Sequence, residues 1–114
     1  FVDQVMVVGA NKPFVAALIV PDFPILEQWC RNNGIHWTAP PYMVLNLRVQ
    51  QLFEVEIEKI NLEIPKFEQI EAFKLLPDPW TETQGELTPT MKIRRKFIAS
   101  KYQPEIEALF VSLK

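Results

Sequence analysis

A dense basic run stands late in the chain, where Lys92 is followed by Arg94, Arg95 and Lys96. Phosphate is the natural partner of such residues, because lysine offers a point charge and arginine a bidentate fork. Basic side chains in the first turn of a helix oppose its dipole, at a cost of about 0.3–1 kcal/mol each. We therefore expect something other than helix stability to keep them there. A solvated basic helix face is the simpler alternative, and the residues alone leave it open.

The other residue types that often do chemistry are too few to complete an active site. His36 is the only histidine, Cys30 is the only cysteine, and the three glycines form no phosphate-binding loop. We expect Cys30 to pack within a helix and His36 to be structural. A single cysteine allows no internal disulfide, which indicates a reducing, cytoplasmic environment. A complete enzyme of ordinary type is not expected from this chain alone.

The composition is that of an ordinary globular domain of 114 residues, with 48% apolar and 23% charged side chains. The formal net charge of −2 gives no overall attraction to nucleic acid or to an anionic membrane. No apolar stretch approaches the roughly 18 residues that indicate a membrane-spanning helix. Phe1 opens the chain in the middle of an apolar pattern, so we expect residues 1–114 to be one domain of a longer protein.

The apolar spacing predicts an α+β fold. Short runs rich in β-branched residues indicate strands, and apolar residues recurring at threes and fours indicate helices. The expected strands lie at 5–8, 14–20 and 70–76, and the expected helices at 23–33, 45–64, 93–101 and from Gln103 onward. A cluster of Gly, Asn and Pro between the first two strands predicts that they pair antiparallel. We therefore expect a small three-stranded, mainly antiparallel sheet, with room for an extra hairpin, flanked by helices.

The predicted loop at 80–90 leads directly into the basic helix. Thr88 or Thr90 is expected to cap the first turn of that helix, and Pro89 stiffens the approach. Ile93 and Phe97 are expected to face the core. Lys92 would then project on a long stem from the junction of loop and helix.

A sequence motif spans this junction, reading Gly-Glu-Leu-Thr-Pro-Thr-Met-Lys-Ile-Arg-Arg-Lys from Gly85 to Lys96. It resembles the last core motif of the adenylate-forming superfamily, which includes acyl-CoA synthetases, luciferases and peptide-synthetase adenylation domains. The form Leu-Thr-Pro-Thr-x-Lys resembles the long-chain fatty acid–CoA ligases in particular. The strand run before Gly9, with the segment 16–22, resembles the strand pair that opens the C-terminal lobe of these enzymes. The motif lysine is Lys92, with support from Gly85, Leu87, Thr88, Pro89, Thr90, Arg94 and Arg95.

Two departures from the superfamily pattern refine the resemblance. Met91 stands where most of the superfamily has glycine before the lysine, although the long-chain branch often has a bulky apolar residue there. Lys12-Pro13 occupies a stretch where many relatives carry Gly-Glu. Both departures point toward the long-chain branch and away from the peptide synthetases.

The resemblance implies a mobile C-terminal lobe of a larger AMP-forming ligase. An N-terminal domain, preceding Phe1 in the parent chain, would bind ATP with magnesium and the fatty acid. Lys92 would contact the fatty-acid carboxylate and the α-phosphate of ATP while the acyl-adenylate forms. The lobe would then rotate, and the loop that contains Gly9 and Lys12 would help to form the entry for coenzyme A.

The implied partners all belong to the full-length enzyme: the N-terminal adenylation domain, the fatty acid, ATP and coenzyme A. The lobe alone is expected to bind no cofactor, to be inactive, to contact no nucleic acid, and to approach a membrane only through its parent. Two alternatives remain open. Another adenylate-forming ligase, for shorter acyl or aryl acids, would share the same lobe. A free-standing binding module would use the basic helix to dock an acidic partner or a nucleic acid.

Overall fold

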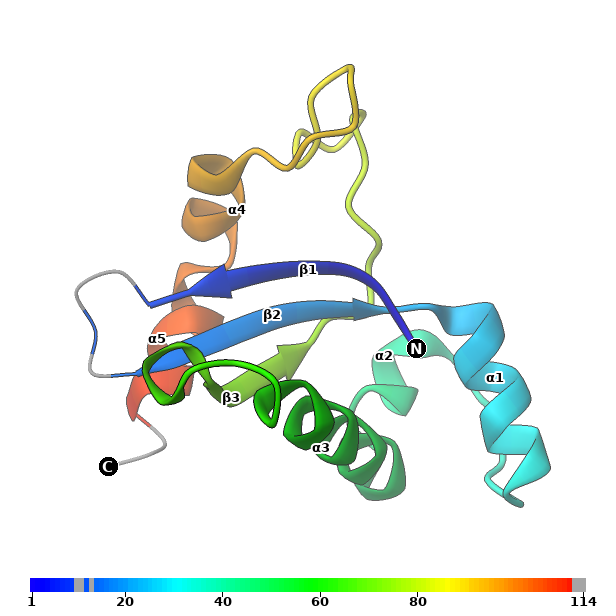
Figure 1. The fold of residues 1–114 in the computed structure, drawn as a ribbon. Helices are drawn as coiled ribbons and strands as arrows, with labels where there is room; N and C mark the ends of the chain where they lie inside the picture. Colours follow the sequence, from blue (N-terminus) through cyan, green and yellow to red (C-terminus); the bar gives the residue numbers. More distant parts are fainter. Residues whose placement is uncertain (10–11, 13, 112–114) are drawn as a thin grey trace.

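The computed structural model describes residues 1–9, 12 and 14–111, and Figure 1 shows their arrangement. The strands are β1 (Val2–Val8), β2 (Val15–Pro21) and β3 (Ile70–Leu75). The helices are α1 (Phe23–Asn32), α2 (Pro40–Met43), α3 (Leu47–Asn61), α4 (Arg95–Lys101) and α5 (Gln103–Val111), with the short 3-10 helix η1 at Lys66–Glu68. None of the helices in these ranges is long and apolar enough to cross a membrane.

Within these residues the strands form one sheet in the order β1-β2-β3. β1 pairs antiparallel with β2, whereas β2 pairs in parallel with β3. A parallel pair needs a long crossover connection, and α1, α2 and α3 lie between the two strands. The predicted three-stranded sheet flanked by helices is confirmed, and its two kinds of pairing make it mixed. An isolated antiparallel bridge between Leu87 and Ile93 supplies the extra hairpin.

Helices cover both faces of the sheet (Figure 1). Ala17 and Ile19 of β2 face a core that they share with residues of α1 and α3, including Phe53. The alternate residues of β2, such as Leu18, face a second core with Ile98 of α4 and residues of α5. β2 is central and buried on both faces, which explains why its sequence is a continuous apolar run rather than an alternating one.

The helix boundaries show where local signals were sufficient. α1 begins after Asp22, whose carboxylate accepts a hydrogen bond from the Ile25 N–H at 3.3 Å, as predicted. α3 is shorter than the predicted 45–64 at both ends. Asn46 caps its start by accepting from the Arg48 and Val49 N–H groups, and the helix ends at Asn61. α2 lies between the predicted helices at 23–33 and 45–64, where no helix was predicted, and two consecutive prolines open it.

The basic helix differs most from expectation. It was predicted from Ile93, but α4 begins at Arg95, because residues 87–93 form a hairpin instead of a first helical turn. Its inward residue is Ile98, which is fully buried, whereas Phe97, predicted to face the core, is 37% exposed. Only Arg95 and Lys96 of the basic run therefore stand in a first helical turn.

The lone cysteine and histidine lie away from this region in the sequence. Cys30 is buried in α1 as predicted, and burial raises the pKa of its thiol. A raised pKa leaves little reactive thiolate at neutral pH. His36 is exposed in the segment between α1 and α2.

Candidate functional site

The loop that carries Lys92 is a closed hairpin, here called the Lys92 hairpin (residues 87–93). Its ends meet at the bridge between Leu87 and Ile93. The Thr88 N–H donates to the Lys92 carbonyl at 2.8 Å, and the Lys92 N–H donates to the Thr88 hydroxyl oxygen at 3.1 Å. The Met91 N–H donates to the Thr88 carbonyl at 2.8 Å, which closes the turn. Thr88 is thus the residue around which the hairpin is built.

The predicted capping role of these threonines is wrong. The Thr88 hydroxyl bonds the Lys92 N–H inside the hairpin, and the Thr90 hydroxyl lies 3.0 Å from the Thr88 hydroxyl. α4 has Arg94 at its N-cap position, without a side-chain cap hydrogen bond. The threonines of the motif therefore shape the backbone beside Lys92 rather than starting the helix.

The Lys92 side chain is exposed on this hairpin. In the part of the chain that the structure describes, its ammonium group has no hydrogen-bond or ion-pair partner. Figure 1 shows the segment as the yellow-to-gold loop that extends away from the sheet beyond α4. A free cation on a closed turn can be presented to an anion outside the domain.

Arg94 and Arg95, by contrast, are held by the domain itself. The Arg94 guanidinium donates to the Gly85 carbonyl at 3.2 Å and lies 5.3 Å from the centroid of the Phe97 ring. The Arg95 guanidinium donates to the Val7 carbonyl of β1 at 2.6 Å. These two residues therefore fix the base of the hairpin to α4 and to the edge of the sheet.

Glu86 is a feature that the sequence did not reveal. Its side chain is only 1% exposed, its Oε1 accepts from the Thr81 N–H at 3.0 Å, and its Oε2 accepts from the Lys101 ammonium at 2.8 Å. The hydrogen bond to Glu86 is the main reason why the pKa of Lys101 is raised above its usual value. The partner lies 15 residues away on α4, so no local spacing could have indicated the pair.

Met91 has a left-handed backbone, with φ of 66°. This conformation costs a non-glycine residue about 1–2 kcal/mol, which explains the physical advantage of glycine at this position of the motif. Pro89 and Thr90, which precede it at the turn, are exposed.

We expect substitutions of Met91 to follow the backbone preference. Met91→Gly should raise the free energy of unfolding by up to about 1 kcal/mol. Relief of the backbone strain stabilises the folded state, and this gain exceeds the cost of about 0.4–1 kcal/mol that comes from the greater flexibility of glycine in the unfolded chain. Met91→Ile should lower it by about 1 kcal/mol or more, since a β-branched residue is a true outlier at positive φ. Urea unfolding of the two variants measures the difference, and equal stabilities would contradict it.

The second predicted site, the loop with Gly9 and Lys12, lies at the opposite end of β1 from Phe1. A Cβ at Gly9 would come within 3.0 Å of the Phe14 carbonyl oxygen, so the turn leaves little room for a side chain. The Lys12 N–H donates to the Gly9 carbonyl at 3.0 Å, and the Lys12 ammonium lies 5.5 Å from the centroid of the Phe110 ring. Pro13, the other residue of the departure noted above, lies outside the described residues.

A pocket of about 280 Å³ joins this loop to α4. Gly9, Lys12 and Arg95 line it together with apolar side chains of β1, α4 and α5, among them Phe110. The structure thus brings the predicted coenzyme A loop and one motif arginine to the same pocket. Lys92 is not among the lining residues.

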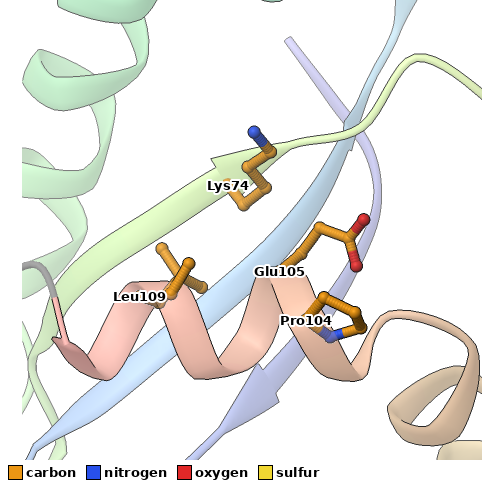
Figure 2. Close-up of a pocket in the computed structure, with 5 residues that line it drawn as sticks. Lys74, Pro104, Glu105 and Leu109 are labelled. Atoms are coloured by element: carbon orange, nitrogen blue, oxygen red, sulfur yellow. The ribbon is translucent and has the colours of Figure 1, made fainter.

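Another pocket, of about 360 Å³, lies between β3 and α5 (Figure 2). Lys74, Pro104, Glu105 and Leu109 line it, and none of these residues belongs to the motif. The buried Glu105 Oε2 has no hydrogen-bond partner among the residues that are described. Across those same residues, no three His, Cys, Asp or Glu side chains are grouped to hold a metal ion.

The family model for the AMP-binding enzyme C-terminal domain matches residues 1–114. The chain belongs to this family. It is thus a C-terminal domain of the AMP-binding, adenylate-forming enzymes, as the motif around Lys92 indicated.

Known ligases resemble this AMP-binding enzyme C-terminal domain over nearly its whole length. It is 36% identical over 110 residues to long-chain-fatty-acid–CoA ligase FadD15 of Mycobacterium tuberculosis, which covers 96% of this chain and 18% of that protein. It is 28% identical over 116 residues to long-chain-fatty-acid–CoA ligase 1 of Cavia porcellus. This match covers 99% of this chain and 16% of that protein. The chain therefore spans less than a fifth of these relatives.

A solved structure shares the fold of this C-terminal domain. The A domain of carboxylic acid reductase from Segniliparus rugosus, in complex with AMP and a co-purified carboxylic acid, superposes with a TM-score of 0.75 at 22% identity. The match covers 99% of this chain and 16% of that one. At this identity the likeness establishes the fold alone.

Proposed function

We propose that the chain is the mobile C-terminal domain of an AMP-forming long-chain fatty acid–CoA ligase. The similarity to long-chain ligases over nearly the whole chain supports this assignment. ATP and the fatty acid would bind to an N-terminal adenylation domain of the same parent chain. The observation that carries the role of this domain is the Lys92 hairpin, whose backbone is closed by its own hydrogen bonds and whose lysine ammonium has no partner among the described residues.

Lys92 would act in the first half-reaction, the formation of the acyl-adenylate. A carboxylate oxygen of the fatty acid attacks the α-phosphorus of ATP, and pyrophosphate leaves with the electron pair of the broken P–O bond. Negative charge accumulates on the α-phosphate oxygens in the transition state. A lysine held against them stabilises that charge and aligns the two reactants. The hydrogen bonds that close the hairpin restrict its backbone motion and so keep Lys92 in a defined position.

The pocket beside Gly9 serves the second half-reaction, after the domain has rotated. Lys12 and Arg95 place two cations at an otherwise apolar hollow. Coenzyme A carries phosphates on a largely uncharged pantetheine arm, so its chemistry suits such a surface. Because Lys92 does not line this pocket, the two half-reactions would use different faces of the domain.

Substrate choice by the full-length protein tests the assignment. We expect AMP release that requires ATP, coenzyme A and a long-chain acid such as palmitate, with much slower release for acetate or benzoate at the same concentration. Faster turnover of acetate or benzoate would instead support a short-chain or aryl ligase. No acid-dependent AMP release, together with salt-sensitive binding of nucleic acid, would support the binding module.

A further inference from the structure

Glu86 is the buried charged side chain among the residues that the structure describes. It lies one residue before the Lys92 hairpin, and its carboxylate, its backbone N–H and its backbone carbonyl all form hydrogen bonds. Its carboxylate accepts from the Thr81 N–H and from the Lys101 ammonium, at 3.0 and 2.8 Å. Its own N–H donates to the Thr81 carbonyl at 3.1 Å, and its carbonyl accepts from the Arg94 N–H at 2.8 Å.

These bonds hold both ends of the hairpin. The turn that enters it is fixed through Thr81, and the chain that leaves it is fixed through Arg94. Lys101 belongs to α4, whose Ile98 is fully buried in the core, so the carboxylate also ties the hairpin to a rigid part of the domain. Two of these four bonds are made by the carboxylate, to the Thr81 N–H and to the Lys101 ammonium, so the direction in which Lys92 points relative to the core depends in part on the Glu86 side chain.

We propose that the buried Glu86–Lys101 pair is a positioning device for Lys92, so that Glu86 governs acyl-adenylate formation without touching a substrate. The inference rests on the proposed function. A group that stabilises a transition state must be placed accurately, and a shift of about 1 Å can cost on the order of 100-fold in rate. In the proposed function, thioester formation does not use Lys92, so its rate should not depend on how the Lys92 side chain is oriented.

Glu86→Gln tests the pair with almost no change in shape. The amide keeps one acceptor oxygen, but its NH2 group must then face either the Thr81 N–H or the Lys101 ammonium, donor against donor. In the full-length enzyme we expect palmitoyl-adenylate formation, measured by pyrophosphate exchange, to fall about 10- to 100-fold. Thioester formation from supplied palmitoyl-adenylate and coenzyme A should change less than twofold.

Lys101→Gln provides a second variant, because it breaks the same pair from the side of α4 and leaves Glu86 in place. It should show the same selective loss of adenylate formation. Glu27→Gln is the matched control, since it removes an ion pair of equal length, 2.8 Å to Arg31, from the exposed surface of α1. Neither half-reaction should respond to it.

A double-mutant cycle separates positioning from simple destabilisation. If Glu86 acts through Lys92, then Glu86→Gln should cause no further loss of adenylate formation in an enzyme that already carries Lys92→Ala. Full additivity of the two losses, or an equal loss in both half-reactions, would overturn the inference. A Lys92→Ala enzyme that still forms adenylate at the normal rate would instead overturn the proposed function.

Discussion

Lys92→Ala in the full-length enzyme is expected to lower acyl-adenylate formation about 100- to 1,000-fold, the usual loss for one preorganised group that stabilises transition-state charge. The ammonium has no hydrogen-bond or ion-pair partner in the described part of the chain, so we expect its removal to leave stability nearly unchanged. Pyrophosphate exchange with palmitate and ATP measures the rate, and thermal unfolding checks the stability.

Lys66→Ala is the matched control for this loss. Lys66 is also an exposed lysine without an ion pair in the described residues, but it lies on η1. If the basic side chains acted only by long-range electrostatic attraction of anionic substrates, the two variants would lose similar activity. Added salt would then lower the activity of the wild-type enzyme about as much as either substitution does. A loss of acyl-adenylate formation in Lys92→Ala but not in Lys66→Ala would support a catalytic role for the Lys92 ammonium at a defined position.

Gly85→Ala is expected to have the largest effect on stability. Gly85 has φ of 93°, and a Cβ there would lie only 2.8 Å from the Phe97 ring carbon Cζ. We expect a loss of about 2–5 kcal/mol in the free energy of unfolding, combining about 1–2 for the backbone with about 1–3 for the overlap. Arg94 should be disturbed as well, because it bonds the Gly85 carbonyl and stacks on Phe97.

Gly34→Ala isolates the backbone part of this effect. Gly34 also has a left-handed backbone, with φ of 70°, but a Cβ there would meet no atom within 4 Å. It should therefore cost only about 1–2 kcal/mol. Urea unfolding of the 114-residue chain compares the two variants. If they were equally destabilised, the Phe97 contact would play no part, and Phe97→Leu would fail to restore the Gly85→Ala variant.

Much of the fold followed from short-range sequence signals. β-branched runs on either side of a turn cluster are enough to place β1 beside β2, and Asp22 is enough to start α1. The parallel pairing of β3 is different, because it depends on how the α1–α3 crossover packs and not on the sequence of β3 itself. α4 was placed two residues early, since the bridge between Leu87 and Ile93 competes with a first helical turn.

The sequence motif named the residues of the candidate site, but not which of them the domain itself holds. The motif indicated Lys92, Arg94 and Arg95 together, yet the structure leaves only Lys92 of these three without an intramolecular side-chain contact in the described chain. Glu86 could not be found from spacing, because its carboxylate is paired with a lysine on a separate helix. The departure at Met91 gained its physical meaning only when the backbone angle was known.

The most direct test of the central claim is the comparison of the two half-reactions in one Lys92→Ala enzyme. Supplied palmitoyl-adenylate and coenzyme A bypass the first half-reaction, so the rate of thioester formation reports only the second. We predict that this rate stays within about twofold of wild type while adenylate formation falls about 100- to 1,000-fold. Equal losses in both half-reactions would contradict a role for Lys92 in adenylate formation alone.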